Sequence, residues 1–517
     1  MSLKGKLNIA LAWKRYKYDQ KERLFSDSPF ESEIIDDNFD DWSSQLDKAL
    51  DNYSPSRAEI INIPKKDFHI RPGTLLTSED AVVYNALLLL EIDKIISALE
   101  WNSGVRSCAY VLKKNQTTNE WFDNQFKAWD SFRQKLINEC ESYRWVVFAD
   151  VSAYFENISL SRLVSDLTDM DLSQEVTNLL YKCLQRWTEP KSRGIPQGNG
   201  ASSILGNVYL NSIDRRMSNK GFIYYRYLDD IRIFCKTHNE AVEALHQLTI
   251  LLREKELNLN TGKTYICESE EALRDIDSIN RIISDIEEQI GKKVDIIFDY
   301  YYGYTHADLD EDVLEDDVPL DLIKETFDQH VEHSFKFDSS LFHYCINKFG
   351  ASNDVYAVDF CLQAINNRPE EFEYILPYFT KLKGNRESIG EKIIDSLKSS
   401  SHVLILERHY FLLLRWFYKN EIVTEKILHL CRDVLSRYDF HVYTRHYAMA
   451  VLGKFGDLSD LDAIEAEYAR TKDEITRTVI LCSIKRMGKS RRNSVYARAE
   501  EDGQKVKYAI KTCKKND

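Results

Sequence analysis

The chain has 517 residues, with 69 Lys and Arg against 83 Asp and Glu, so its formal net charge is −14. A content of 43% hydrophobic and 12% aromatic residues is typical of a globular protein with two to four domains and excludes wholesale disorder. Neither an apolar run of the roughly 20 residues needed to cross a bilayer nor a signal peptide is found. The ten cysteines are scattered without a CxxC pair, which predicts reduced thiols in a cytoplasmic protein and indicates neither a zinc site nor a disulfide framework.

The excess of acidic residues bears on the kind of partner. A protein that holds a long nucleic-acid duplex normally presents a basic surface that replaces the phosphate counterions. A net charge of −14 therefore predicts weak non-specific binding to nucleic acid, although a local basic groove remains compatible with it.

Helices and strands alternate over roughly residues 60–270. Apolar periodicity predicts helices over 80–100 and 118–142, and "RWVVFADV" predicts a short buried strand that ends at Asp150. The Gly-rich loop "SRGIPQGNGASS" precedes a further helix. The segment "IYYRYLDDIRIFC" then predicts a hairpin, followed by a helix over 239–256. This order of elements indicates an α+β domain.

Two adjacent aspartates, Asp229 and Asp230, lie at the centre of the hairpin segment. A tight turn is an ordinary place for Asp, so an exposed corner would explain the pair by itself. The flanking alternation, however, predicts a half-buried hairpin, with one apolar face on each strand. These faces comprise Ile223, Tyr225 and Tyr227, and Ile231, Ile233 and Cys235. Two carboxylates in such a hairpin repel each other unless a cation offsets them, and oxygen ligands favour Mg²⁺ or Mn²⁺.

A third carboxylate, Asp150, ends the predicted strand of "VVFADVSAYFENI". An open sheet would present it beside the hairpin. Together with Asp229 and Asp230 it could hold two metal ions, one for the attacking hydroxyl and one for the leaving pyrophosphate. The pattern indicates nucleotidyl transfer.

The segments "FADVSAYFENI", "GIPQGNG", "YLDD" and "LNLNTGKT", in this order, resemble the palm motifs of reverse transcriptases. The resemblance covers about half of the chain and implies a palm-and-fingers fold with DNA polymerase activity on dNTPs. It implies that Asp150, Asp229 and Asp230 are catalytic, and that they bind two Mg²⁺ (or Mn²⁺) ions together with Val151.

The same resemblance assigns nucleotide-binding residues. Phe155 matches the aromatic steric gate that selects dNTPs, and Lys263 matches a palm lysine that donates a proton to pyrophosphate. The loop that packs against the incoming nucleotide comprises Gly194, Pro196, Gln197 and Gly198. Without the motifs, Phe155 would be a core aromatic residue and Lys263 a surface lysine.

Upstream, "PKKDFHIRPG" resembles the fingers strand whose cations hold the triphosphate. Arg71 is the best match, because a guanidinium suits a phosphate clamp, with Lys65 and Lys66 behind it. A solvated basic edge is the alternative interpretation of these three residues.

The C-terminal half has helical periods and a weak internal repeat that starts at Arg408, Arg445 and Arg477. We expect an all-α HEAT-like repeat domain there. Eight acids between Asp308 and Asp321 predict a solvated linker or insertion. The predicted divisions are 1–60 (N-terminal extension), 61–275 (fingers and palm), 276–321 (acidic linker) and 322–517 (helical repeats).

A palm and fingers joined to helical repeats resembles the abortive-infection (Abi) branch of bacterial reverse transcriptases, which act in phage defence. This resemblance implies synthesis of single-stranded DNA without a template, priming on a tyrosine with the product covalently attached, and homo-oligomers. Two features depart from the usual family pattern: Ser203 stands where a proline is common, and no recognisable thumb follows Lys263.

Tyr16 and Tyr18 lie in the basic, mobile-looking "WKRYKYDQK" and are candidate priming residues, with Tyr300 to Tyr304 as rivals. A metal-activated phenol is required, since an unperturbed tyrosine has a pKa near ~10. Two other functions stay open: a templated RNA-directed DNA polymerase with a bound RNA, and a binding scaffold whose palm is inactive.

Overall fold

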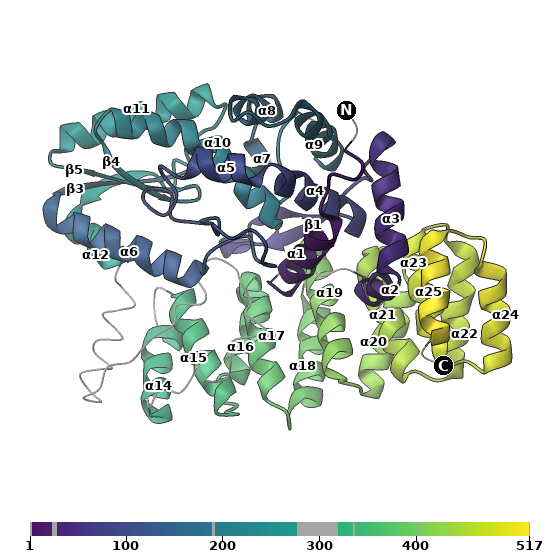
Figure 1. Cartoon of the computed structure of the whole chain (residues 1–517). Coiled ribbons are helices and arrows are strands. Elements are labelled where there is room, and N and C mark those ends of the chain that lie inside the picture. Colours follow the sequence, from purple (N-terminus) through teal and green to yellow (C-terminus); the bar gives the residue numbers. More distant parts are fainter. Residues whose placement is uncertain are drawn as a thin grey trace. The chain divides into compact units, whose positions relative to one another are not determined.

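The computed structural model describes residues 3–22, 28–188, 192–276, 319–333, 337–400 and 403–515 (Figure 1). The chain divides into two compact units. The first comprises Met1–Arg23, Leu46–Ile60 and Gly73–Tyr304, and the second comprises Leu24–Gln45, Ile61–Pro72 and Thr305–Asp517. Part of the expected N-terminal extension and part of the expected fingers therefore group with the C-terminal helices.

The first unit is built on a four-stranded sheet with the strand order β4-β5-β3-β6. Its strands are β3 (Trp145–Asp150), β4 (Ile223–Tyr227), β5 (Asp230–Cys235) and β6 (Tyr265–Glu268). Neighbouring strands pair antiparallel. Helix α11 (His238–Glu254) lies over one face, and α6 (Gln125–Ser142) and α12 (Ser269–Ile276) lie over the other (Figure 1). The middle of β3 is therefore buried on both sides, which explains its unbroken apolar sequence.

Most predicted elements of this unit are confirmed, with shifted ends. The strand that ends at Asp150 is β3, and the helix after the Gly-rich loop is α10 (Gly200–Asn219). The prediction of a single helix over 80–100 is wrong. The chain forms two helices there, α4 (Ser78–Leu90) and α5 (Ile92–Leu99), which meet at Glu91.

The predicted buried face of β4 is wrong at two of its three residues, since only Tyr227 is buried. Tyr224 and Arg226 are fully buried, whereas Ile223 and Tyr225 are partly exposed. The reason is electrostatic: Arg226 pairs with Asp214 inside the unit, so the strand turns its charged side inward. The prediction for β5 is confirmed, since Ile231, Ile233 and Cys235 are all buried.

The remaining described helices of the first unit are α1 (Ile9–Glu22), α7 (Tyr154–Asn157), α8 (Leu160–Asp169) and α9 (Gln174–Trp187). The prediction that the segment with Tyr16 and Tyr18 is mobile is wrong, because this segment forms part of α1, which packs on α4. Trp13 and Tyr16 are its buried aromatic anchors, each 2% exposed. Strands β1 (Glu59–Pro64) and β2 (Ile70–Leu75) form a separate two-stranded sheet.

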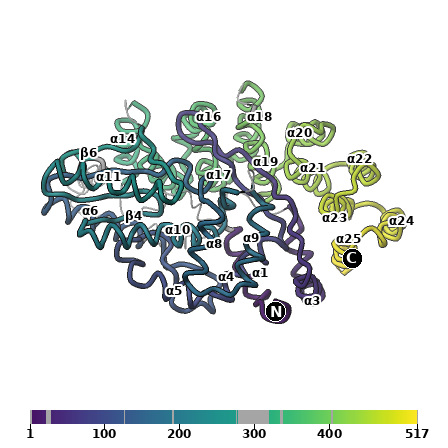
Figure 2. The backbone as a smooth tube through the Cα atoms, turned by 90° about the horizontal axis from the view of Figure 1, so that it is seen from above, coloured from purple at the N-terminus to yellow at the C-terminus, as the bar shows by residue number. Residues whose placement is uncertain are grey.

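The second unit is helical in its described C-terminal part (Figure 2). Its helices are α14 (Leu320–Phe327), α15 (Ser339–Ala351), α16 (Val358–Asn367), α17 (Phe372–Lys381), α18 (Arg386–Ser399), α19 (Val403–Asn420), α20 (Glu425–Ser436), α21 (Val442–Phe455), α22 (Leu458–Glu467), α23 (Glu474–Ser483), α24 (Lys489–Ala499) and α25 (Gln504–Lys515). The odd-numbered helices from α15 to α25 contact one another in succession, and α16, α18 and α20 form a second row. The repeated segments predicted from the sequence fall on α19, α21 and α23.

An N-terminal segment completes the second unit. Helix α2 (Glu31–Asp37) packs on α25, more than 460 residues away along the chain. Asn38 donates to the Thr512 hydroxyl at 3.2 Å, and the Tyr508 hydroxyl donates to Asp41 at 2.8 Å. The segment Leu24–Gln45 therefore belongs to the same folded body as the C-terminal helices.

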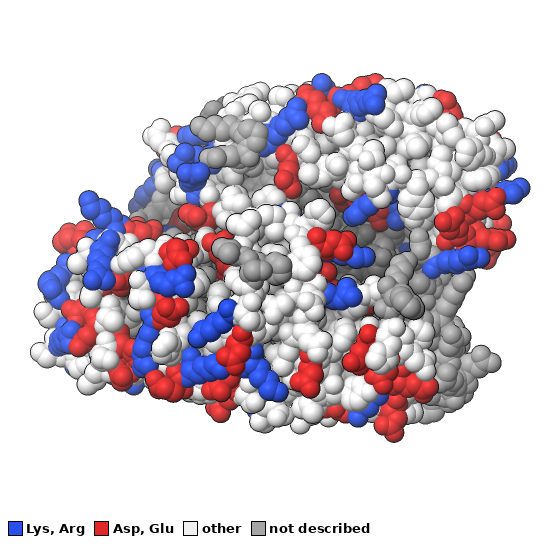
Figure 3. Space-filling model, turned by 180° about the vertical axis from the view of Figure 1, so that it is seen from behind, with Lys and Arg blue, Asp and Glu red and all other residues white. Residues whose placement is uncertain are grey.

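Surface charge is mixed in sign on the face that Figure 3 shows, where Lys and Arg are interspersed with Asp and Glu. Within the described residues, no helix is both long and apolar enough to cross a membrane.

Candidate active site

The sheet places two of the predicted catalytic carboxylates side by side. Asp150, the last residue of β3, is the register partner of Asp230, the first residue of β5. Asp229 precedes Asp230 in the tight β4–β5 turn and is half-buried. Like charges directly opposite each other on neighbouring strands destabilise a sheet, so this edge requires nearby positive charge.

Positive and amide groups surround these carboxylates. Arg232 forms an ion pair with Asp230 and stacks over the Phe148 ring, with its guanidinium carbon 4.0 Å from the ring centroid. Asn260 donates to Asp150 Oδ2 at 3.0 Å, and Lys263 Nζ lies 3.8 Å from Asp150 Oδ1. The Lys263 side chain is 67% exposed, and its role as a proton donor stays a prediction.

Asn260 and Arg232 were not predicted. Asn260 lies inside the quoted "LNLNTGKT" motif, where its backbone N–H also donates to the Asp150 carbonyl at 2.8 Å. The two bonds fix the main chain and the side chain of Asp150 together. The signal that could have indicated Asn260 was its amide side chain, which lies inside this motif two residues after Asn258.

The backbone is strained on both sides of the aspartates. Leu228, immediately before Asp229, has a φ of 59°, and Ala153, three residues after Asp150, has a φ of 45°. Positive φ is uncommon in residues other than glycine and clusters at functional sites when the surrounding structure holds it. Something must therefore hold the Leu228 turn.

Hydrogen bonds from Arg226 stabilise the turn at Leu228. Its Nη1 donates to the Leu228 carbonyl at 3.1 Å and to Asn207 Oδ1 at 2.7 Å. Its Nε and Nη2 donate to the carboxylate of Asp214 on α10, at distances of 2.8 to 3.0 Å. Both side chains of the pair are 0% exposed. Arg226 is a positioning residue that the sequence did not reveal.

The charge of Arg226 is stabilised within the fold. Burial lowers the pKa of the Arg226 guanidinium. The charge of the Asp214 carboxylate and its hydrogen bonds raise this pKa by more than burial lowers it, so the net pKa lies above the ordinary value. Tyr224 also donates its hydroxyl to Asp214 at 2.9 Å. The buried carboxylate is thus satisfied from two residues of β4.

The Gly-rich loop packs against the segment that carries Phe155. The N–H groups of Gly194 and Ile195 donate to the carbonyls of Ile158 and Phe155, at 2.8 and 2.9 Å. Gly194 has a φ of 91°, and a Cβ there would lie 3.3 Å from the Glu156 carbonyl oxygen. Gln197 follows, with its amide 3.5 Å from Glu156 Oε1. Gly198 has a φ of 89° and open space around it.

Phe155 and the aspartate turn meet over Gly206 of α10. A Cβ on Gly206 would lie 3.4 Å from the Leu228 side chain and 3.6 Å from the Phe155 ring. The predicted steric gate therefore lies next to the turn that carries Asp229. Its role in sugar selection stays a prediction.

The donor set fits the predicted metal ions in its chemistry. Asp150, Asp229 and Asp230 offer only carboxylate oxygens, which suit Mg²⁺ or Mn²⁺. In the described residues, no three or more His, Cys, Asp or Glu side chains converge closely enough to hold a metal ion. Arg232 and Asn260 hold Asp230 and Asp150, so these two carboxylates would turn from their partners to bind one. Val151, the fourth predicted ligand, is 2% exposed and bridges to Leu259.

The predicted triphosphate clamp belongs to the second unit. The charge of Arg71 acts on Glu373 and Tyr374 of α17, and lowers the pKa of each against the larger, raising effect of burial. Lys65 is exposed, and its N–H donates to the His69 carbonyl at 2.7 Å. A role of Arg71 and Lys65 in triphosphate binding stays a prediction.

The candidate priming tyrosines lie on α1. Tyr16 is buried, with its hydroxyl 3.4 Å from the Ser78 hydroxyl, and would have to leave this position to act as a nucleophile. Tyr18 is half-buried. The rivals at 300–304 and the acidic residues 308–318 lie outside the described residues.

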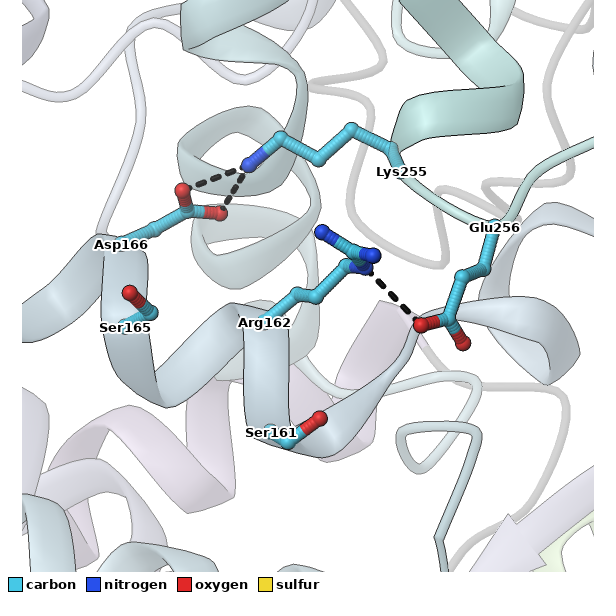
Figure 4. A pocket seen from close by; sticks show the side chains of 6 residues that line it. All are labelled: Ser161, Arg162, Ser165, Asp166, Lys255 and Glu256. Carbon is cyan, nitrogen blue, oxygen red and sulfur yellow. Dashed lines mark hydrogen bonds and ion pairs between the residues drawn. The ribbon is translucent and has the colours of Figure 1, made fainter.

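A separate pocket of about 340 Å³ in the first unit is lined by α8 and the residues after α11 (Figure 4). Lys255 pairs with Asp166 at 2.5 Å, and Arg162 pairs with Glu256 at 2.9 Å. Because its charged groups pair with one another, we interpret this pocket as a structural network.

Sequence comparison defines the class of this site. The family model "Reverse transcriptase (RNA-dependent DNA polymerase)" matches residues 63–314, the span that contains the palm motifs quoted from the sequence. Among curated proteins, Protein YkfC of Escherichia coli (strain K12) is 24% identical over 259 residues, which cover 42% of this chain and 64% of that protein. Group II intron-encoded protein LtrA of Lactococcus lactis subsp. cremoris is 25% identical over 247 residues, 43% of this chain and 37% of that protein.

The chain spans less than two thirds of the length of these relatives. Among solved structures, telomerase from Candida albicans, in complex with a fragment of telomeric RNA, matches at a TM-score of 0.33 and 10% identity. That match covers 73% of this chain and 68% of the telomerase chain. At this score the likeness carries no argument about function.

Proposed function

We propose that this protein is a DNA polymerase of the reverse transcriptase type, which joins dNTPs to a hydroxyl group with release of pyrophosphate. The observation that carries the proposal is the register pair of Asp150 and Asp230, with Asp229 in the adjoining turn, inside a reverse transcriptase domain. This pairing of carboxylates supports two-metal nucleotidyl transfer.

Each residue near the pair has a role in this reaction. Asp150, Asp229 and Asp230 would hold two Mg²⁺ (or Mn²⁺) ions, which would supply activation of the attacking hydroxyl and stabilisation of the leaving pyrophosphate. Asn260 orients Asp150. Lys263, 3.8 Å from Asp150, gives its proton to the pyrophosphate.

Substrate selection falls to the loop and the gate. Phe155 excludes the 2′-hydroxyl of a ribonucleotide by its bulk, and the backbone of Gln197 and Gly198 packs against the incoming dNTP. Arg71 and Lys65 hold the triphosphate.

The more specific proposal is untemplated, self-primed synthesis in abortive infection against phage. In this reaction a tyrosine oxygen, with Tyr16 and Tyr18 as candidates, attacks the α-phosphorus of a dNTP. The new O–P bond forms as the bond to pyrophosphate breaks, and the phenolic proton passes to solvent. The net charge of −14 supports a polymerase that does not hold a long duplex, and the helical second unit supports a HEAT-like repeat that assembles homo-oligomers.

The test is incubation of nuclease-treated, full-length protein with Mg²⁺ and labelled dNTPs but without template, followed by a denaturing gel. We expect label that migrates with the protein, survives denaturation and disappears in Asp229→Ala. Asp93→Ala, an exposed aspartate on α5, is the matched control and should retain the label.

The second candidate is a templated RNA-directed DNA polymerase with a bound RNA, which the likeness to the group II intron-encoded protein favours. Label that appears only after a primed RNA template is added would support it and refute self-priming. If Asp229→Ala instead left phage protection intact, the palm would be inactive and the protein would be a binding scaffold.

A further inference from the structure

The second unit contains a pocket of about 430 Å³ among its last helices. Its walls come from α21 and α23, from the residues that join α23 to α24, from Arg492 of α24, from Tyr418 of α19, and from Phe30, which precedes α2. This volume lies within the range of about 300–1,000 Å³ of small-molecule sites. It serves none of the roles assigned above.

The lining is strongly cationic. Four of its residues are Lys454, Lys485, Arg486 and Arg492, and none of the described lining residues is acidic. In a chain with a net charge of −14, such a cluster predicts an anionic occupant. The four positive charges match a polyphosphate better than a single carboxylate.

Main-chain contacts hold these cations in place. Arg486 Nη1 donates to the carbonyls of Lys454 and Gly456 at 3.0 and 2.9 Å, at the C-terminal end of α21. Arg492 Nη1 donates to the Lys485 carbonyl at 2.5 Å. The carboxylate of Glu421 pairs with Lys454 at 2.6 Å and is itself 67% exposed, and the charge of Glu33 also acts on Tyr418 and Cys482 of the lining. Such a surface pair is weak enough to exchange for a phosphate.

A buried hydroxyl adds an independent sign of a ligand. Ser483, the last residue of α23, lines the pocket and is 3% exposed, and its Oγ has no hydrogen-bond partner among the described residues. A buried polar group without a partner is costly and rare, so it indicates a missing partner. A phosphate oxygen would supply an acceptor for this hydroxyl.

The rest of the wall is aromatic. Phe30 and Tyr418 meet edge to face, with ring centroids 5.9 Å apart, and Lys454 Nζ lies 5.5 Å from the Tyr418 centroid. Phe30 has a φ of 74°, a genuine outlier for a bulky residue, so the fold holds this ring at the pocket against backbone strain. Aromatic faces next to phosphate-binding cations are the chemistry that recognises a nucleotide.

We propose that this pocket binds a free nucleoside di- or triphosphate, with the phosphates on Lys485, Arg486, Arg492 and Ser483 and the base against Phe30 and Tyr418. Because Phe30 reaches the pocket from the N-terminal segment, the bound nucleotide would fix that segment onto the C-terminal helices. The inference is independent of the proposed polymerase activity.

Calorimetric titration of the full-length protein with ATP, GTP, CTP and UTP in EDTA tests the proposal. Chelation of divalent ions removes triphosphate binding at the aspartates, whereas the pocket supplies its own cations. We expect at least one nucleotide to bind. Adenosine and tripolyphosphate should each bind at least about tenfold more weakly than that nucleotide. No binding by any nucleotide, or binding of tripolyphosphate alone as tight as that of the nucleotides, would overturn it.

Variants locate the site. Lys485→Ala should weaken nucleotide binding about tenfold, and Ser483→Ala should weaken it without lowering the melting temperature of the free protein, because its hydroxyl has no partner to lose. Phe30→Leu should weaken nucleotide binding and leave tripolyphosphate binding unchanged. Lys507→Ala, an exposed lysine of α25 outside the pocket, is the control. Unchanged affinity in both Lys485→Ala and Ser483→Ala would refute the site.

Discussion

At the scale of single residues, the geometry of the aspartate turn depends on a buried ion pair. Arg226 and Asp214 are both inaccessible to solvent, and Arg226 also donates a hydrogen bond to the Leu228 carbonyl. A buried pair of this kind contributes little compared with well-packed apolar side chains, but breaking it leaves one charge uncompensated. Its value is therefore in fixing one conformation of the turn.

Replacement of one partner should expose that dependence. In Arg226→Leu, Asp214 stays buried without its counter-charge, so we expect a loss of about 3–5 kcal/mol in the free energy of unfolding. Urea denaturation of the purified variant measures it. The double variant Arg226→Leu/Asp214→Leu should recover much of the loss, and a single variant within about 1 kcal/mol of the parent would show that the pair does not act this way.

Phe155 provides a functional prediction at the same scale. Because its ring lies beside the aspartate turn, Phe155→Val should admit ribonucleotides and lower the ratio of kcat/KM for dNTP over rNTP by about 10–100-fold. Single-nucleotide incorporation measures the ratio. Phe155→Tyr keeps the bulk of the ring and should keep the discrimination. A ratio unchanged in Phe155→Val would make the residue an ordinary core aromatic.

The contrast between these residues shows what the sequence could provide. Asp150 and Asp230 could be placed together because each ends or begins a strand with a clear pattern. Arg226 could not, because its partner Asp214 lies on a helix and only the folded chain brings them together. Simple alternation instead favoured Tyr225 for the interior of β4, since hydrophobic patterns do not show that a charged side chain is paired and buried.

At the scale of elements, the second unit combines periodic helices with contacts that the period does not show. The three repeated arginines lie on α19, α21 and α23, as the sequence spacing indicated. Arg445 bonds Glu467 at 2.7 Å and Arg477 pairs with Asp502 at 3.2 Å, each with a carboxylate of a following segment. Arg408 pairs instead with Glu373 of a preceding helix. Each of the three arginines therefore lies on a helix, but the ion pairs that they form do not repeat.

His446 on α21 joins three segments of this unit. Its Nδ1 lies 3.0 Å from the Ser28 hydroxyl and its Nε2 lies 2.9 Å from the Thr476 hydroxyl. Burial lowers the pKa of the imidazole from its ordinary 6.5 to about 3, against a raising effect of Asp473 and with smaller lowering effects of His441 and Arg445. The folded protein thus keeps His446 neutral down to about pH 3.

This shift predicts a pH dependence of stability. Between about pH 6.5 and pH 3 the unfolded chain binds the additional proton, so the free energy of unfolding should fall as the pH is lowered through this window. The slope from one such group is at most about 1.4 kcal/mol per pH unit. Urea denaturation at several pH values should give a shallower profile for His446→Gln than for the parent. His429→Gln, an exposed histidine of α20, should follow the parent. Equal slopes for all three would exclude this role.

At the scale of the whole molecule, the chain passes repeatedly between its two units. Residues Leu24–Gln45 belong to the same unit as Thr305–Asp517. Ile34 and Ile35 of α2 are 4% and 2% exposed, and this burial requires the C-terminal helices that α2 packs against. The division expected from the sequence, an N-terminal extension followed by separate domains, did not include this return, because pairing of distant segments leaves no local pattern.

The second unit should therefore need its N-terminal segment. We expect a fragment of residues 319–517 to melt at a higher temperature when a peptide of residues 28–45 is added, because the peptide restores buried apolar contacts with α25. Differential scanning fluorimetry over a range of peptide concentrations measures the shift. The same peptide with Ile35→Asp should have no effect, and a fragment indifferent to the unmodified peptide would show that the segment adds nothing to its stability.

The contact between the N-terminal segment and α25 also determines the order in which parts of the chain can fold during translation. Asn38 leaves the exit tunnel early, but the carbonyl of Tyr508 with which it bonds lies 470 residues later. At about 5–20 residues per second, roughly 25–90 s of translation separate the two. The sheet that carries the three aspartates is synthesised well within that interval. The nascent chain therefore holds a complete palm before α25 is available to α2, and the second unit can close only after α25 has left the ribosome.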